Sequence, residues 1–163
     1  MPTLEERVQS IEDREEIRRL KSRYARYTDD KYDLDGIVSL FTEDAVFDCT
    51  DFGVYKGHEA IRNFFAAIKE NLTFTVHFHM DEIIDIDPSG EEATATWYFL
   101  DPETVQGEAI LVAGTYDERY RKVNGRWLAS HVTVNFLFRT PWNSNWVKEP
   151  MVSGDTFYEG LET

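Results

Sequence analysis

The chain has 163 residues, of which 31 are acidic and 17 are basic, so its formal net charge at pH 7 is −14. This length fits a single domain, and the negative charge repels phosphates, which argues against nucleic acid as a partner. The single cysteine, Cys49, excludes an intrachain disulfide and a cysteine-based zinc cluster. The N-terminus lacks an apolar signal core, and no apolar run approaches the ~20 residues of a membrane helix. We therefore expect a cytoplasmic protein without a membrane partner.

The first part of the chain has the periodicity of amphipathic helices. Apolar side chains recur at spacings of three and four between residues 11 and 27, which predicts one long helix with Asp29 just beyond its end. The stripe consists of Ile17, Leu20, Tyr24 and Tyr27. A second, short helix is expected after Asp33, a typical N-cap residue, with its stripe at Leu34, Ile37, Val38 and Phe41. A short strand at 45–47 and a turn at 54–57 precede a third helix, whose apolar side carries Ile61, Phe64, Phe65 and Ile68.

From residue 72 onward the pattern is typical of strands. We predict strands at 72–86, 92–100, 108–123 and 126–139, separated by residues 87–90, 101–103 and 124–125. Asn124-Gly125 is a strong hairpin signal because it lies between two apolar strands. Helices followed by an antiparallel meander predict an α+β fold. We expect one domain over residues 1–140 and a tail over 141–163 that packs on the domain or on a neighbouring subunit. The aromatic residues of this tail are Trp142, Trp146, Phe157 and Tyr158.

The predicted strand at 72–86 begins with one apolar and one polar face. Alternation separates Phe74, Val76, Phe78 and Met80 from Thr73, Thr75, His77 and His79. A polar face this close to an apolar helix is either solvated or lines a cavity that holds a ligand. In the second case His77 is a candidate general base, because a neutral imidazole accepts a proton near pH 7. The alternative is that His77 is a satisfied core histidine and that Asp29 caps a turn.

Several short segments, in this order and spacing, resemble the SnoaL-like or nuclear-transport-factor-2-like superfamily. They are residues 20–24 followed by Asp29, then 40–45, 55–57, 75–77, 114–116 and 124–127. The resemblance covers about residues 8–140. It implies a cystatin-like α+β cone, in which three N-terminal helices pack on a curved, mainly antiparallel sheet around a pocket.

Within this superfamily the chain looks most similar to scytalone dehydratase, bile acid 7α-dehydratase and hexachlorocyclohexane dehydrochlorinase. These lyases eliminate water or HCl from a ring without a cofactor or metal. The resemblance implies that His77 is the base, that Asp29 orients it, and that Tyr24 is the hydrogen-bond donor of the dehydratases. The dehydrochlorinase has an arginine on its last strand, where this chain has Val132. The dehydratase activity is therefore favoured.

A metal site is the competing interpretation of the two strand histidines. A His-x-His pair can chelate a metal, with His131, Asp81 or Glu82 as the only third-ligand candidates. None of them has the spacing of a cupin, so we expect neither a metal nor a cofactor. His131 is expected on the face of the last strand opposite to that of Val132, away from the cavity. The candidate substrate-binding residues are Phe47, Tyr55, His79, Tyr98, Val132, Val134 and Phe136.

The leading functional hypothesis is a cofactor-independent lyase, or a related isomerase or cyclase, that acts on a small hydrophobic cyclic ligand. The alternative is a non-catalytic binding or assembly module of the same fold, like the small subunit of ring-hydroxylating dioxygenases. A closed apolar pocket that contains His77 and Asp29 would favour the enzyme, and a filled interior would favour the module. The resemblance also implies a homo-oligomer, a dimer or a trimer, formed through the sheet.

Overall fold

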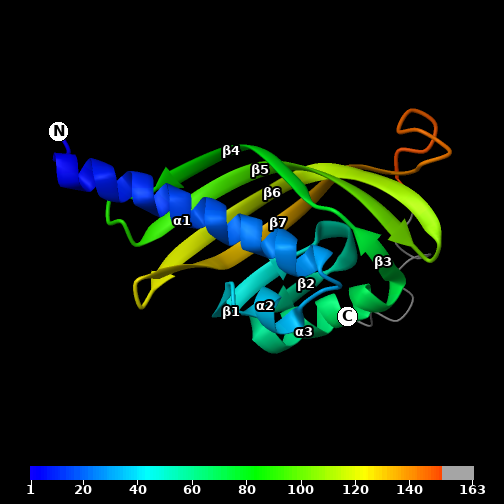
Figure 1. Cartoon of the computed structure of the whole chain (residues 1–163), viewed down its shortest axis with the longest axis horizontal. Coiled ribbons are helices and arrows are strands. Elements are labelled where there is room, and N and C mark those ends of the chain that lie inside the picture. The colour runs from blue at the N-terminus through cyan, green and yellow to red at the C-terminus, as the bar shows by residue number, and fades with distance from the viewer. Residues whose placement is uncertain (152–163) are drawn as a thin grey trace.

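The computed structural model describes residues 1–151, and these form three helices, one 3₁₀ turn and a seven-stranded sheet (Figure 1). In chain order the elements are α1 (Leu4–Asp29), α2 (Leu34–Val38), β1 (Phe41–Asp48), η1 (Thr50–Phe52), β2 (Val54–Lys56), α3 (Gly57–Asn71), β3 (Leu72–Thr75), β4 (Phe78–Ile86), β5 (Glu92–Val105), β6 (Glu108–Val123) and β7 (Arg126–Pro141). The predicted α+β class and the order of helices before the meander are confirmed.

Helix α1 begins earlier than the apolar periodicity predicts. Thr3 and Glu6 form a capping box, in which each side chain accepts a hydrogen bond from the other residue's backbone N–H. This cap starts the helix at Leu4, although the residues of its first two turns are exposed. The predicted stripe packs inward, and Ile17, Leu20 and Tyr24 are all buried. The helix ends at Asp29, which places this carboxylate at the end of the buried face.

The second and third helices are close to their predicted positions. Asp33 caps α2 by accepting a hydrogen bond from the Gly36 N–H at 3.1 Å. Phe41 is not part of this helix: it begins strand β1, which is longer than predicted and pairs in parallel with β7. Residues 54–56 form strand β2 rather than a turn. In α3 the whole predicted apolar side is buried, and each such side chain contributes roughly 1.5–3 kcal/mol to stability; these residues are Ile61, Phe64, Phe65 and Ile68.

The prediction of one continuous strand over 72–86 is wrong. The chain leaves the ladder at residues 76 and 77, which separate β3 from β4. The pairing register also shifts between Leu72 and Phe74, so Thr73 is exposed while Thr75 is buried. The apolar set does point outward: Phe74, Phe78 and Met80 are exposed on the outer side of the sheet. His79, on the other side of β4, therefore faces the interior rather than the solvent.

The prediction that residues 101–103 form a turn is also wrong. Strand β5 runs through them to Val105, and the chain turns at Gln106-Gly107, where both residues have positive φ. Pro102 is tolerated because it lies where the partner of β5 changes from β4 to β3, so its missing N–H interrupts neither ladder. The Asn124-Gly125 hairpin between β6 and β7 is confirmed, with φ values of 51° and 75°.

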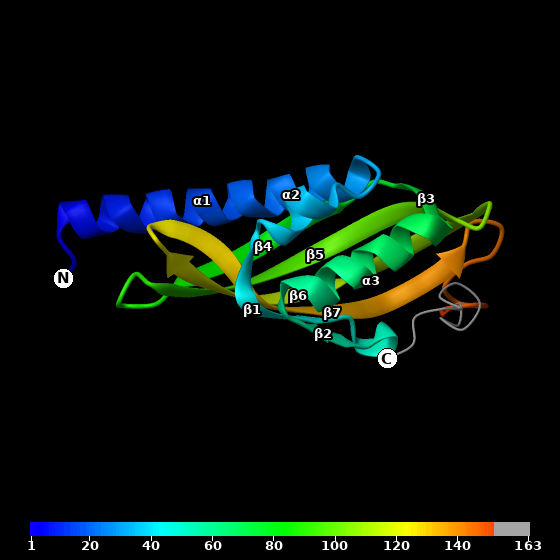
Figure 2. The same cartoon turned by 90° about the horizontal axis from the view of Figure 1, so that it is seen from below.

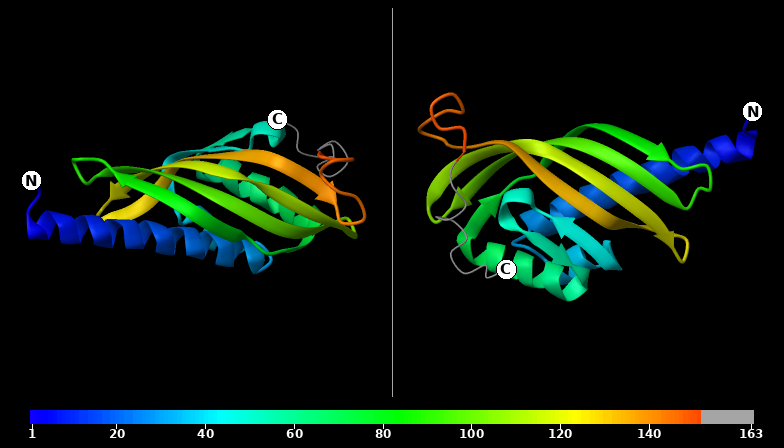
Figure 3. Two further views of the ribbon diagram at one scale, coloured as in Figure 1. Left: turned by 90° about the horizontal axis from the view of Figure 1, so that it is seen from above. Right: turned by 180° about the vertical axis from the view of Figure 1, so that it is seen from behind.

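The sheet order is β2-β1-β7-β6-β5-β3, and β4 also pairs with β5. All pairs except β1·β7 are antiparallel. The sheet curls around the inner side of α1 and α3, which lie along the same face (Figure 2). Seen from behind, the strands lie in front of the helices, and within the described residues no helix covers this outer face (Figure 3). None of the helices in residues 1–151 has the length and apolar character needed to cross a membrane.

The predicted aromatic tail is described only as far as residue 151. Trp146 stacks on Phe138 of β7, with ring centroids 5.2 Å apart, and both Trp146 and Trp142 are exposed. A backbone hydrogen bond from Arg139 to Pro150 holds the described end of this segment to the last strand. Phe157 and Tyr158 lie outside the described residues, so the docking of the whole tail stays a prediction.

Candidate active site

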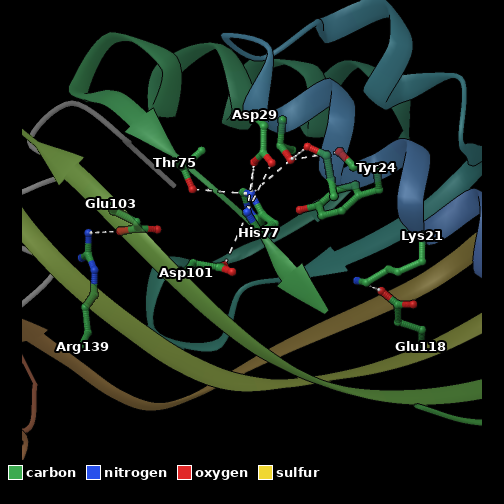
Figure 4. A network of polar contacts seen from close by, with 11 residues as sticks. Lys21, Tyr24, Asp29, Thr75, His77, Asp101, Glu103, Glu118 and Arg139 are labelled. Atoms are coloured by element: carbon green, nitrogen blue, oxygen red, sulfur yellow. Dashed lines mark hydrogen bonds and ion pairs between the residues drawn. The ribbon is translucent and has the colours of Figure 1, made fainter. Parts of the chain in front are cut away.

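The predicted contact between Asp29 and His77 is present. Asp29 Oδ1 lies 2.7 Å from His77 Nδ1, at the end of α1 and in the gap between β3 and β4 (Figure 4). The same carboxylate accepts a hydrogen bond from the backbone N–H of His77 at 3.1 Å. This N–H is available because residues 76 and 77 have left the ladder. The sequence did not predict this interruption of the strand. Because of it, Asp29 contacts both the backbone N–H and the ring of His77.

Two threonines complete the surroundings of the Nδ1 side of the ring. Thr28 Oγ1 lies 3.3 Å and Thr75 Oγ1 3.5 Å from His77 Nδ1. Because Asp29 accepts at Nδ1, the neutral imidazole carries its proton there, and Nε2 is left to accept another. The His77 side chain is only 8% exposed, whereas that of Asp29 is 26% exposed. The carboxylate thus lies between the buried imidazole and an open hollow on the surface.

A second carboxyl group faces the other side of His77. Asp101 Oδ2 lies 3.7 Å from His77 Nε2, and Asp101 is buried on β5. Its other oxygen, Oδ1, is buried and has no hydrogen-bond partner within the described part of the chain. Burial raises the pKa of Asp101 to about 7, although His77 acts in the opposite direction. This acid can therefore hold a proton near neutral pH, which an ordinary aspartic acid cannot.

The pKa of His77 reflects two opposing effects. Burial alone would lower it, because the charged imidazolium loses its hydration. The carboxylates of Asp101 and Asp29 outweigh this effect, and the pKa is raised above its ordinary value. The imidazolium that forms when His77 accepts a proton is thus stabilised from both sides of the ring.

His77 and Asp101 contribute to the wall of a small cavity of about 60 Å³ between the sheet and helices α1 and α3. Most of the other lining residues are aromatic or aliphatic, and Tyr24 lies on the same wall as His77, with ring centroids 6.0 Å apart. Glu103 adds a second carboxyl group to this lining, and its Oε2 lies 3.5 Å from Arg139 Nη2. Burial raises the pKa of Glu103 as well. The lining thus combines an apolar surface with a few convergent polar groups, as in small-molecule sites, but the volume is well below the roughly 300–1,000 Å³ of such sites.

The structure brings together only part of the predicted substrate-binding set. Phe47, Val134 and Phe136 line the cavity with His77. Tyr55 stacks on Phe64 and donates to the Phe52 carbonyl, so it supports the wall from behind. His79 is mostly buried and lies among rings, 5.4 Å from Tyr116 and 5.9 Å from His77 by centroid. Burial lowers the pKa of His79 far below its ordinary value, so it stays neutral.

Tyr98 and Val132, both predicted to bind substrate, lie away from this cavity. Tyr98 is 52% exposed on the outer face of β5, because it has the opposite strand parity from the cavity residues Phe99 and Asp101. Val132 is buried, yet it lies in a separate small void beside Lys21 and Tyr24 rather than in the His77 cavity. His131 lies on the outer side of β7, as predicted, with Nε2 3.2 Å from Thr133 Oγ1.

Asp101, Glu103 and Lys21 were not predicted. The sequence contained a signal for the two acids: odd-numbered positions from Ala93 to Phe99 are buried, and the same alternation continues to 101 and 103. Because Asp101-Pro102 is also a turn signal, we predict that the strand ends at residue 100, and this prediction misses the continued alternation. Lys21 lies four residues after Ile17, which places it on the inner stripe of α1.

The residues 1–151 contain no group of three His, Cys, Asp or Glu side chains arranged to hold a metal ion. The expectation that the reaction needs no metal stays a prediction. Elemental analysis of protein purified without added metal should find less than stoichiometric zinc, iron or manganese. One equivalent that is lost on substitution of His77 or His79 would favour metal-assisted chemistry instead.

Comparison with solved structures finds the same fold in several proteins. A protein of Novosphingobium aromaticivorans, provisionally assigned as an aromatic ring hydroxylase, is 30% identical, with a TM-score of 0.75 over 80% of this chain and 94% of its own. A hexachlorocyclohexane dehydrochlorinase of Novosphingobium barchaimii is 19% identical, with a TM-score of 0.76 over 85% of this chain and 95% of its own. A provisionally assigned scytalone dehydratase of N. aromaticivorans is 19% identical, with a TM-score of 0.75 over 84% and 92%. The last two likenesses, at this identity, show the fold alone.

Sequence comparison gives the family directly. No curated protein matches the chain. The model of the SnoaL-like domain matches residues 9–133, which include most of α1, the Asp29–His77 contact and most of the sheet. Together with the shared fold, this match identifies the chain as a member of the SnoaL-like family.

Proposed function

We propose that the protein is a cofactor-independent lyase of the dehydratase type that acts on a small hydrophobic cyclic substrate. The observation that carries this proposal is the position of His77, buried at the wall of an aromatic cavity with one ring nitrogen on Asp29 and the other facing Asp101. Elimination of water needs a base for a C–H proton and an acid for the leaving hydroxyl. His77 and Asp101 have the positions for these two roles, and the pKa of about 7 lets Asp101 hold a proton near neutral pH.

In the proposed reaction, His77 Nε2 removes a proton from a carbon next to a carbonyl group. The electron pair of this C–H bond forms the new double bond, and the C–O bond of the neighbouring hydroxyl breaks. Asp101 gives its proton to that hydroxyl, which leaves as water, and the proton on Nε2 then restores Asp101. The Tyr24 hydroxyl donates to the carbonyl oxygen while negative charge develops there. Asp29 keeps the imidazole in the required tautomer.

The related isomerase and cyclase reactions begin with the same removal of a proton beside a carbonyl. A non-catalytic binding module of this fold is the competing proposal, since many folds carry sites with and without chemistry. The cavity lined by His77 supports the enzyme, although Asp29 does not line it, whereas one relative carries a provisional assignment as a hydroxylase. Thermal melts with hydroxylated cyclic ketones, steroids and aromatic polyketides would find ligands, because a ligand of the folded state raises Tm. A compound that binds but is never converted by the wild-type protein would favour the module.

The pH dependence of turnover tests the pairing of His77 with Asp101. The proposed reaction needs a single proton on this pair, so turnover should fall at low pH, when both groups are protonated, and at high pH, when neither is. The pKa of about 7 for Asp101 places the alkaline fall near or above neutrality. In Asp101→Asn the alkaline fall should disappear, because the only remaining group is His77, which works better when deprotonated. An unchanged bell-shaped profile in Asp101→Asn would contradict the assignment of Asp101.

A homo-oligomer remains part of this proposal. Strands β4 and β5 expose a run of paired apolar side chains on the outer face of the sheet, with Phe78 opposite Leu100 and Met80 opposite Tyr98. A second copy of the chain offers an equally apolar and self-complementary surface to cover them. Light scattering should therefore give a mass of two or three chains. Substitution of Phe78 and Tyr98 by Lys should lower that mass, and a wild-type monomer would contradict the proposal.

A further inference from the structure

A buried ion pair lies beside Tyr24, on the side away from His77. Lys21 comes one turn before Tyr24 on α1, and its Nζ donates to Glu118 Oε1 of β6 at 2.6 Å (Figure 4). The two side chains are 3% and 4% exposed. Glu118 also accepts a hydrogen bond from the Tyr120 hydroxyl. Burial lowers the pKa of Lys21, and the charge of Glu118 acts against this effect.

The ammonium group of Lys21 does more than pair with Glu118. Its Nζ lies 3.3 Å from the centroid of the Tyr116 ring and 4.9 Å from that of Tyr24. A cation on the face of an aromatic ring is attracted by the ring electrons, and the attraction is stronger where water is excluded. The cation therefore draws electron density from the phenol of Tyr116.

Tyr116 is connected in turn to the proposed active site. Its ring packs edge to face with that of Tyr24, with ring centroids 6.2 Å apart, and both residues line the cavity with His77. A hydrogen bond from Tyr116 lowers the pKa of Tyr24 against the larger rise caused by burial. Because hydrogen bonds in a chain polarise one another, a stronger donor at Tyr116 makes Tyr24 a stronger donor as well.

We propose that Lys21 is a positioning residue for the reaction proposed above. It would act through Tyr116 on Tyr24, so that the Tyr24 hydroxyl is oriented and polarised toward a substrate oxygen that gains negative charge. This inference rests on the proposed function and narrows it, since such a device serves a substrate that passes through an enolate. A substrate whose carbonyl cannot enolise would gain nothing from it.

The simpler explanation is that the Lys21–Glu118 pair only joins α1 to the sheet, and the chain contains a matched control for it. Asp13 and Lys122 form a second pair between α1 and β6, at 2.8 Å, with both side chains mostly buried. Lys122 lies over the ring of Trp127, not over a tyrosine of the cavity. If both pairs only join α1 to β6, removal of either should have the same effect. The proposed role predicts an effect on Tyr116 and on turnover only for the Lys21–Glu118 pair.

The experiment compares two double variants, Lys21→Met with Glu118→Gln, and Asp13→Asn with Lys122→Met. Each removes both charges of one pair, so no single buried charge is left without a partner. The first readout needs no substrate: 3,5-difluorotyrosine is incorporated at position 116, and its ionisation is followed by absorbance. Removal of the Lys21 pair should raise the pKa of this phenol, and removal of the Lys122 pair should leave it unchanged. Three other groups that face Tyr116, namely Tyr24, His79 and Asp101, stay the same in both variants. Loss of the Glu118 charge would by itself lower the pKa of Tyr116, so a rise must come from the loss of Lys21.

The second readout is turnover of a substrate identified in the thermal screen. Loss of the Lys21 pair should lower kcat about tenfold or more, whereas loss of the Lys122 pair should leave kcat unchanged. In a Tyr116→Phe background, removal of the Lys21 pair should no longer lower kcat. This comparison tests the proposal even if the fluorinated protein does not fold. Equal effects of the two double variants on the phenol and on kcat would overturn the proposal. If no compound is converted, the proposed function fails, but the titration still decides whether Lys21 acts on Tyr116.

Discussion

Substitution of His77 by Ala is expected to lower kcat by about 10²-fold or more, the usual contribution of a general base. The variant removes the imidazole, which lines the cavity and whose Nε2 faces Asp101. It should remain folded, because His77 lines a cavity, and a cavity-lining side chain supports less packing than one in the core. Asp29, which loses its ring contact, is 26% exposed and can be solvated. The measurement is steady-state turnover together with a thermal melt.

His131→Ala is the matched control for this prediction. His131 is likewise a partly buried histidine, but it lies in strand β7, on the outer side of the sheet, with Thr133 as its partner. Its loss should leave kcat unchanged. If His77→Ala converts a true substrate at the wild-type rate, the proposed mechanism is wrong, whatever the fold.

Substitution of Asp29 by Asn should reduce kcat by about 10²-fold or more as well, although the side chain keeps its shape. The amide has no charge to stabilise the imidazolium, and its NH₂ group can turn toward Nδ1, which would then have to accept. The proton of the neutral ring would move to Nε2, the atom that must remain free to act as a base. The expected sign is therefore a fall in kcat with little change in KM, since Asp29 does not line the cavity.

Asp30→Asn provides the control for the Asp29 variant. Asp30 is the next residue, is exposed, and borders the same outer hollow as Asp29. The same chemical change there removes one negative charge at almost the same place without touching the imidazole. An equal loss of turnover in both variants would assign the effect to surface charge and would exclude an orienting role for Asp29.

The sequence by itself determined the elements whose signals are local. The stripe of α1, the apolar side of α3 and the Asn124-Gly125 hairpin follow from periodicity and turn chemistry, and the structure confirms them. The resemblance to the SnoaL-like family likewise depended on the order of short segments, and the family match confirms it. The contact of Asp29 with His77 was predicted from that resemblance and is present at 2.7 Å.

Only the tertiary structure decided where the strands are interrupted and which polar groups lie together. An Asp-Pro pair is a turn signal in isolation, but in β5 it lies where the sheet partner changes, so the strand continues and places Asp101 beside His77. Tyr98 and Asp101 differ in strand parity, and this alone places one on the outer face and the other at the cavity. Lys21 and Glu118 are 97 residues apart in the chain and meet because α1 crosses β6. Contacts of this kind depend on the curvature of the sheet, which no local pattern in the sequence encodes.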